Sequence, residues 1–210
     1  MKRGKLIAFE GIDGCGKTTQ LRRLAAGLRA SGADVVATFE PTAGEMGQRI
    51  RAMARSGDSV PPETELDWFL TDRREHVETV VEPQLAAGKW VLCDRYTLSS
   101  VAYQGARGLD WRSILERSES DFPRPDLVLL FEVPAALGLE RVTTRGGVLE
   151  PQFEEQDFLE QVARIFSELD CDYIERIDAR PDPDNVTQKT VLALERRLGV
   201  RLEEQALSER

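Results

Sequence analysis

Eight consecutive residues near the N-terminus have the types and spacing of a phosphate-binding loop. Residues 11–18 read Gly-Ile-Asp-Gly-Cys-Gly-Lys-Thr and match the pattern G-x-x-x-x-G-K-[ST]. Glycines let backbone N–H groups converge on one anion without clashes from Cβ atoms. In this pattern Lys17 reaches the terminal phosphates and the Thr18 hydroxyl binds Mg²⁺. The residues expected to contact ATP or GTP here are Gly11, Ile12, Asp13, Gly14, Cys15, Gly16, Lys17, Thr18 and Thr19.

The segments on either side of this loop are those that the motif requires. Residues 5–10 form an apolar run that predicts a buried strand. Residues 18–30 place Leu21, Leu24 and Leu28 on one face, which predicts a helix. The N-terminus of that helix would add its dipole to the anion site.

A second pair of residues suited to phosphate chemistry follows a later apolar run. Asp94 ends the run that begins at Val91, and in phosphate-loop proteins such a carboxylate helps to hold the metal. Arg95 comes next and could neutralise charge that develops during phosphoryl transfer. Taken alone, the aspartate could simply end a buried strand and the arginine could form a surface ion pair.

Apolar runs alternate with helical patterns through most of the chain. This alternation predicts a three-layer α/β fold in which helices flank a parallel sheet of five strands. Together with the phosphate-binding loop it indicates a fold of the P-loop NTPase type. Pro83 is expected to bend or restart the third helix. The predicted strands are 5–10, 34–39, 89–94, 127–132 and 173–178. The predicted helices are 18–30, 45–56, 62–87, 135–144, 157–169 and 185–198.

Length and composition indicate one domain with an ordinary core. The chain has 210 residues, and we expect a single domain over 1–200, a short lid near 144–156 and a charged tail over 201–210. A net charge of −9 argues against nucleic acid as the main partner. No apolar run is long enough for a membrane span, and the three cysteines lack metal-ligand spacing. These features predict a cytoplasmic protein with reduced thiols.

Three blocks of residues closely resemble the thymidylate kinase family. They are residues 9–13, residues 69–73 (Phe-Leu-Thr-Asp-Arg) and residues 94–105, which start Asp-Arg-Tyr and end Ala-Tyr-Gln-Gly. With shorter matches at 40–41, 47–51 and 177–180, the resemblance extends from Leu6 to about Gly199. It implies an enzyme that transfers the γ-phosphoryl group of ATP to the 5′-phosphate of thymidine monophosphate (dTMP). It also implies Mg²⁺ as cofactor and a homodimer.

The resemblance implies roles for side chains around the base and sugar. Asp13 would meet the 3′-hydroxyl of the acceptor sugar. Phe69 would stack on thymine, and Arg73 would bind the carbonyl edge of the base. Ser100 and Gln104 would line the base pocket.

The remaining implied roles concern the deoxyribose and the phosphates. Tyr103 would lie under the deoxyribose and disfavour a 2′-hydroxyl, while Arg51 and Arg95 would hold the acceptor phosphate. A dianionic acceptor must approach a tetra-anionic donor, so several cations are needed around both. We therefore expect Lys17 and Arg95 to be catalytic, together with an arginine of the lid.

The chain departs from the family pattern at three places. Gln161, where the family more often has arginine, has no expected consequence, and the other two concern cations at the phosphates. Phe39 stands where many bacterial members have the arginine of an Arg-Glu-Pro sequence. The variable loop positions contain no arginine, and the lid stretch 144–153 contains only Arg145, with Arg141 on the preceding helix. We expect Arg141 to contact ATP and Arg145 to reach the transferring phosphate when the lid closes.

Several of these residues also have purely structural interpretations. Phe69 falls on the apolar face of its helix and Tyr103 could be a packing residue. One arginine of the pair Arg49 and Arg51 is expected to be only solvated. His76, the single histidine, lies in a helical pattern and is expected to be structural.

Other functions remain open at this level. A related nucleoside monophosphate or deoxynucleoside kinase with another pyrimidine acceptor would share the loop and the cations. A GTPase-type switch would need an Asn-Lys-x-Asp sequence, and the chain has none. A non-catalytic nucleotide-binding protein is disfavoured because Lys17, Thr18, Asp94 and Arg95 are all present.

The role expected for the lid arginine can be tested by its removal. Replacing Arg145 with alanine should lower kcat at least tenfold, or about 1.4 kcal/mol in activation free energy, because one cation at the transferring phosphate is lost. ATP affinity should change less. Steady-state kinetics beside an ATP titration measure both, and a near-normal kcat would contradict the role.

Overall fold

A computed structural model describes residues 3–144 and 155–202 of the chain. Its centre is a five-stranded sheet in the order β2-β3-β1-β4-β5, and every neighbouring pair is parallel. The predicted α/β fold with five parallel strands is therefore confirmed. The strands are β1 (Lys5–Glu10), β2 (Val35–Phe39), β3 (Trp90–Asp94), β4 (Leu127–Glu132) and β5 (Ile174–Asp178).

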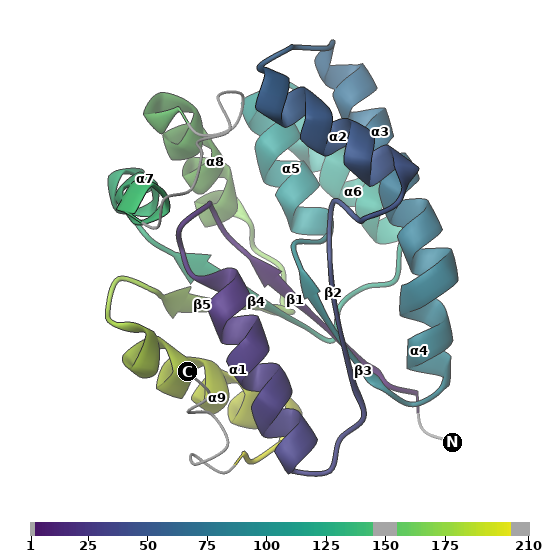
Figure 1. Cartoon of the computed structure of the whole chain (residues 1–210), viewed down its shortest axis with the longest axis vertical. Coiled ribbons are helices and arrows are strands. Elements are labelled where there is room, and N and C mark those ends of the chain that lie inside the picture. The colour runs from purple at the N-terminus through teal and green to yellow at the C-terminus, as the bar shows by residue number, and fades with distance from the viewer. Residues whose placement is uncertain (1–2, 145–154, 203–210) are drawn as a thin grey trace.

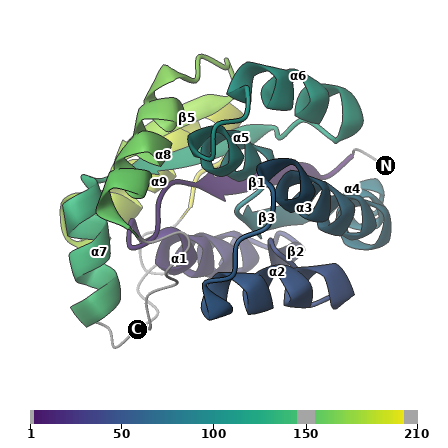
Figure 2. The ribbon, with the colours of Figure 1, turned by 90° about the horizontal axis from the view of Figure 1, so that it is seen from above.

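Helices cover both faces of this sheet and give the molecule three layers (Figures 1 and 2). The helices are α1 (Lys17–Ala30), α2 (Glu45–Ser56), α3 (Pro62–His76), η1 (Val77–Val81), α4 (Glu82–Ala86), α5 (Thr97–Ala106), α6 (Trp111–Asp121), α7 (Ala135–Thr144), α8 (Gln156–Glu168) and α9 (Pro183–Leu198). Helices α1 and α9 pack together on one face, and α4, α5 and α8 lie on the other. Helix α6 packs against α5, and α2 packs against α3.

The central strands are buried on both faces, as their continuous apolar sequences predict. In β1, Leu6, Ile7 and Phe9 are fully buried, and the ring of Phe9 stacks on that of Phe131 in β4. The register places Phe9, Asp94 and Phe39 in one row across β1, β3 and β2. The residues that follow each of them therefore meet at the carboxyl edge of the sheet, where α/β proteins bind their ligands.

Two parts of the helical layer differ from the expected elements. Helices α5 and α6 occupy the interval between the third and fourth strands, where no element was predicted. The expected helix 62–87 is continuous, but it contains a π-helical turn at Val77–Val81, and the Glu82 N–H bonds to the carbonyl of Val77. Pro83 has no N–H to continue the α-helical ladder, which accounts for the wider turn just before it.

The described residues form one continuous hydrophobic core. Of the expected lid, 145–154 lies outside the described residues, and so does 203–210 of the expected tail. Within 3–144 and 155–202, no helix combines the length and the apolar character that crossing a bilayer requires.

Helix α7 packs directly against the loop between β1 and α1, backbone to backbone. A Cβ atom at Gly138 would lie 2.5 Å from the carbonyl oxygen of Asp13. A Cβ atom at Gly14 would lie 2.0 Å from the carbonyl oxygen of Gly138. Both glycines are therefore required for this close approach, which ties the position of α7 to that of the loop.

Substituting Gly138 with alanine should destabilise the protein by about 1–3 kcal/mol, because the new methyl group overpacks the contact with Asp13. Helix propensity alone would predict the opposite sign, a gain of up to about 1 kcal/mol. Urea unfolding measures the change in free energy. The control is Ala136→Gly on the exposed side of α7, which should cost only its propensity of about 1 kcal/mol. A G138A protein as stable as the wild type would show that the contact is looser than described.

Candidate active site

The loop between β1 and α1 is shaped by glycines in conformations that other residues avoid. Gly11, Gly14 and Gly16 have φ values of 134°, 76° and 98°. Gly16 caps the N-terminus of α1, so the backbone N–H groups of the first turn are available to an anion. The Lys17 ammonium donates to the carbonyl oxygens of Gly11 and Ile12 at 3.0 and 2.9 Å. The lysine is thus folded over its own loop.

Thr18 and Asp94 meet beside this loop. The Thr18 hydroxyl donates to the Asp94 carboxylate at 2.5 Å, which joins the start of α1 to the end of β3. Both side chains offer oxygen atoms, the ligands that Mg²⁺ prefers, and both line the same cavity as Lys17. These two oxygen ligands therefore fit a magnesium ion at the position that the sequence predicts.

Arg95 adopts a strained backbone conformation next to the loop. Its φ of 66° lies in the left-handed region, the only such value at a non-glycine residue within 3–144 and 155–202. Its Nη2 contacts the Asp13 carboxylate at 2.6 Å and the Tyr103 hydroxyl at 3.2 Å. Its Nη1 donates to the Ser99 hydroxyl at 3.3 Å. The guanidinium is thereby held between the loop and α5.

The charges around Asp13 determine its ionisation. Burial alone would raise the pKa of Asp13, but the charges of Arg95 and Lys17 lower it below its ordinary value. The same ion pair holds the pKa of Arg95 well above its usual range, against the effect of burial. Asp13 is therefore ionised at neutral pH and is a hydrogen-bond acceptor.

A cavity of about 570 Å³ opens beside Asp13 and Arg95, and we call it the aromatic cavity. Its walls come from the end of β2, from α2, α3 and α5, and from the loop after β1. It brings together all but one of the residues expected at the acceptor, namely Asp13, Arg51, Phe69, Arg95, Ser100, Tyr103 and Gln104. Phe69 is only partly buried and faces this cavity rather than the core. Exposed Arg49 stacks instead on Trp68, 4.0 Å from the ring centroid.

Arg73 is the expected acceptor residue that does not line this cavity. Its side chain is 1% exposed and lies behind the cavity wall. Nε contacts Glu40 at 2.8 Å, and Nη2 donates to the Tyr96 carbonyl and the Ser100 hydroxyl at 2.8 and 3.0 Å. Nη1 has no hydrogen-bond partner among the described residues. In this arrangement Arg73 fixes two wall residues, Glu40 and Ser100, and keeps one buried donor free.

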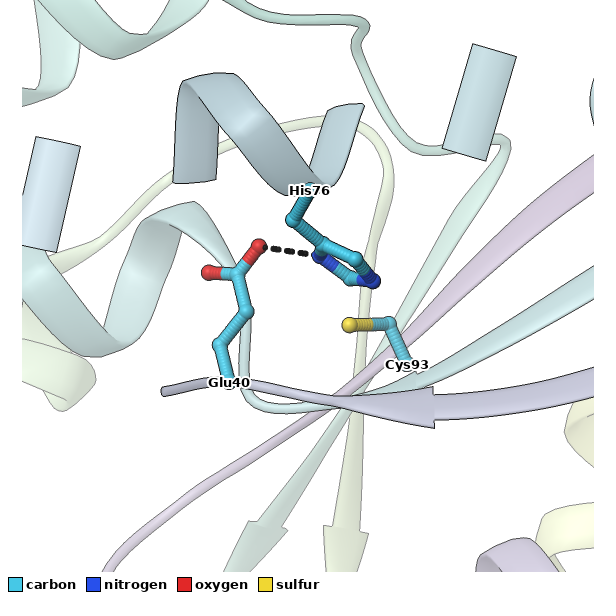
Figure 3. Close-up of side chains that lie close together, drawn as sticks. All are labelled: Glu40, His76 and Cys93. Atoms are coloured by element: carbon cyan, nitrogen blue, oxygen red, sulfur yellow. Dashed lines mark hydrogen bonds and ion pairs between the residues drawn. The ribbon is translucent and has the colours of Figure 1, made fainter. Parts of the chain in front are cut away.

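Glu40 belongs to a buried cluster with His76 and Cys93 (Figure 3). The His76 ring contacts Glu40 through Nδ1 at 2.9 Å and the Thr38 hydroxyl through Nε2 at 2.7 Å. The ligand atoms of the three lie within 4.8 Å of one another. However, Glu40 already holds Arg73, and burial raises the pKa of Cys93 well above its usual range. We interpret the cluster as a hydrogen-bonded support for the cavity wall, and His76 as structural.

Two further cavities adjoin the loop at Gly14, Gly16 and Thr19. The loop cavity, about 620 Å³, lies over Lys17 and Thr18 and shares Asp13, Phe39, Glu40 and Arg95 with the aromatic cavity. The lateral cavity, about 530 Å³, lies on the other side of the loop and is lined by α7 and by the segment after β5. The residues that line it and were expected to bind ATP are Gly14, Cys15, Gly16, Thr19 and Arg141.

Arg141 lines the lateral cavity and also forms hydrogen bonds to two other residues of its wall. Its two terminal nitrogens donate to the carbonyl oxygens of Ala179 and Arg180 at 2.9 and 2.8 Å. This fixes the segment after β5 to α7. Arg145, the other lid arginine expected at the phosphates, lies outside the described residues.

Sequence reasoning missed the carboxylates that support the site. Glu10 is fully buried and accepts hydrogen bonds from the N–H groups of Tyr96 and Ser99 at 2.9 and 3.1 Å. Glu40 was noted only as part of a motif, yet it holds Arg73 and lines the aromatic cavity. The available signal was an acidic residue at the end of an apolar strand, which occurs at Glu10 as it does at Asp94.

Comparison with known proteins gives one consistent family. The family model described as thymidylate kinase matches residues 9–190. A thymidylate kinase from Desulfotalea psychrophila is 47% identical over 195 residues, which cover 93% of this chain and 96% of that protein. A thymidylate kinase from Xanthomonas euvesicatoria is 46% identical, and the match covers 89% of this chain and 81% of that protein. One from Akkermansia muciniphila is 40% identical, and the match covers 93% of this chain and 94% of that protein. By these matches over most of its length, the chain belongs to the thymidylate kinase family.

Proposed function

We propose that this protein transfers the γ-phosphoryl group of ATP to the 5′-phosphate of dTMP, giving dTDP and ADP. The observation that carries this proposal is the junction of the loop cavity with the aromatic cavity at Asp13 and Arg95. A donor held at the loop and an acceptor held among the aromatic residues would meet there. Bringing two phosphates together in this way supplies much of the catalysis of phosphoryl transfer.

The aromatic cavity suits a deoxynucleoside monophosphate. The ring of Phe69 offers a face for a pyrimidine, and Ser100 and Gln104 offer polar groups at its edge. Asp13 accepts hydrogen bonds and suits the 3′-hydroxyl of the sugar. Tyr103 is held by Asp13 and Arg95 and would leave little room for a 2′-hydroxyl.

The Arg73 guanidinium would contribute to base binding from behind the wall. It positions Ser100 directly, and its free Nη1 is a donor that a carbonyl group could satisfy. Its role in the proposal is therefore to shape the base site and to offer one hydrogen bond.

The donor would occupy the loop and the lateral cavity. Lys17 would leave the loop carbonyls for the phosphates of ATP, and Arg141 holds the wall beside the lateral cavity. Thr18 and Asp94 would hold Mg²⁺, which neutralises phosphate charge.

The protein's contribution to the chemical step is positioning and positive charge. Arg95 can face both phosphates because it lies at the junction of the cavities, and Arg51 approaches the acceptor side from α2. The acceptor phosphate oxygen attacks as a dianion, so no general base is needed for the transfer. A homodimer and a cytoplasmic location are part of the same proposal. The homodimer rests on the family resemblance, and the location rests on the apolar runs and cysteine spacing of the sequence.

ADP release with Mg-ATP and a panel of acceptors tests the substrate. We expect dTMP to give the highest kcat/KM. Deoxyuridylate should fall about 10- to 200-fold lower, since it lacks only the methyl group. Uridylate should be poorer than deoxyuridylate because of Tyr103, and adenylate should be inactive. Preference for a different monophosphate would keep the phosphotransferase chemistry and reject dTMP as the substrate.

The junction arginine provides a second test. Arg95→Lys keeps the charge but loses the planar pair of nitrogens that spans Asp13 and Ser99, so kcat/KM for dTMP should fall at least 100-fold, or about 2.7 kcal/mol. Arg74→Lys, an exposed position on α3, is the matched control and should stay within twofold of wild type. If R95K retained more than a third of wild-type activity, Arg95 would not be the shared phosphate contact.

A further inference from the structure

A buried polar pair, Glu65 and Gln104, lies at the wall of the aromatic cavity, and Glu65 has no part in the roles described so far. Glu65 is on α3, one turn before Phe69, and Gln104 is on α5. Their side chains are buried, with relative exposures of 1% and 0%. The Gln104 amide donates from Nε2 to Oε1 of Glu65 at 2.9 Å.

The carbonyl oxygen of the Gln104 amide, Oε1, is a buried acceptor that receives no hydrogen bond from the described residues. Gln104 itself lines the aromatic cavity. Buried polar atoms without partners are rare in folded proteins. A ligand that donates an N–H group from within the cavity would satisfy this atom.

Glu65 determines which end of the amide is presented. An ionised carboxylate only accepts hydrogen bonds, so the NH₂ group of Gln104 must face it and the carbonyl must face away. Arg107, with its Nε 3.7 Å from Glu65, favours the ionised form. Burial raises the pKa of Glu65, and the Gln104 hydrogen bond and the Arg107 charge partly offset this. Without the carboxylate, the amide could turn over and present its NH₂ group instead.

We propose that Glu65 is a positioning residue for base specificity, which fixes the Gln104 carbonyl as an acceptor in the aromatic cavity. The matching ligand edge is an N–H donor such as the N3–H of thymine or uracil. Cytosine has an unprotonated N3 at the same place, and two acceptors would then face each other. This inference rests on the proposed function, because it assigns the specificity of the same acceptor site.

The test compares dTMP with 5-methyldeoxycytidine monophosphate, because both carry the 5-methyl group. They differ only at N3, which Gln104 would read, and at the C4 substituent beside it. Isothermal titration calorimetry gives the dissociation constant of each for wild type and for Glu65→Gln. A glutamine at this position can donate or accept, so it no longer fixes the Gln104 amide. The preference for dTMP should fall at least tenfold in E65Q. KM for dTMP should rise while kcat changes less than threefold.

Two controls separate this role from a structural one. Glu63→Gln makes the same change at an exposed position in the first turn of α3, and it should leave the ratio of the two affinities unchanged. ATP affinity and the melting temperature report on folding. If E65Q weakens both monophosphates equally, or leaves their ratio intact, the inference is overturned.

The exchanged pair, E65Q combined with Q104E, guards against a packing effect. It keeps one amide and one carboxylate in contact and again presents a fixed acceptor to the cavity. Its dTMP preference should exceed that of E65Q at least threefold, and an equal or lower preference overturns the inference. A wild-type protein inactive on dTMP overturns the proposed function and this inference together. An active wild type with an unchanged ratio in E65Q overturns this inference alone.

Discussion

The arrangement of the site depends on one buried carboxylate at the end of the central strand of the sheet. Glu10 ends β1, and its two oxygens accept hydrogen bonds from the N–H groups of Tyr96 and Ser99 and from the Ser99 hydroxyl. Burial raises its pKa, and these three bonds and the charge of Arg95 oppose that shift. The carboxylate thereby ties the strand before the phosphate loop to the first turn of α5. Arg95, in its left-handed conformation, directly precedes Tyr96, whose N–H group is one of the two that donate to Glu10.

Buried polar and charged groups recur through the wall of the aromatic cavity, and each one positions the next. His76 contacts Glu40, Glu40 contacts Arg73, and Arg73 contacts Ser100 at the cavity. Each link is nearly inaccessible to water, so removing one partner would leave an uncompensated charge or polar group behind. These groups therefore fix the shape of the wall more than they add stability, because desolvation offsets most of the attraction within each pair.

The sequence predicts this molecule best where one physical cause dominates. Strand β4 has the predicted limits because a continuous apolar run buried on both faces admits few alternatives. Helices α5 and α6 were missed because residues 97–106 mix Thr, Ser, Val and Tyr, which have weak helix propensity, and α6 is mostly polar. The helical spacing of apolar residues correctly predicts that Arg73 lies on a helix. How deeply its side chain is buried behind the cavity wall depends on the packing of α3 against α5, which no local sequence pattern encodes.

The aromatic side chain at position 39 affects how charge is balanced at the junction of the cavities. Phe39 is half exposed there and brings no cation, although it lines both cavities. Among the residues that the structure describes, the cations lining the aromatic cavity are Arg51 and Arg95, and those lining the loop cavity are Lys17, Arg22 and Arg95. Arg95 alone belongs to both sets. Two polyanions that approach each other repel strongly, so the cation between them has the largest effect on the barrier. Phe39 stands at the end of β2, where many family members have an arginine, and this leaves the function to Arg95, whose neighbour Tyr96 donates its N–H group to Glu10.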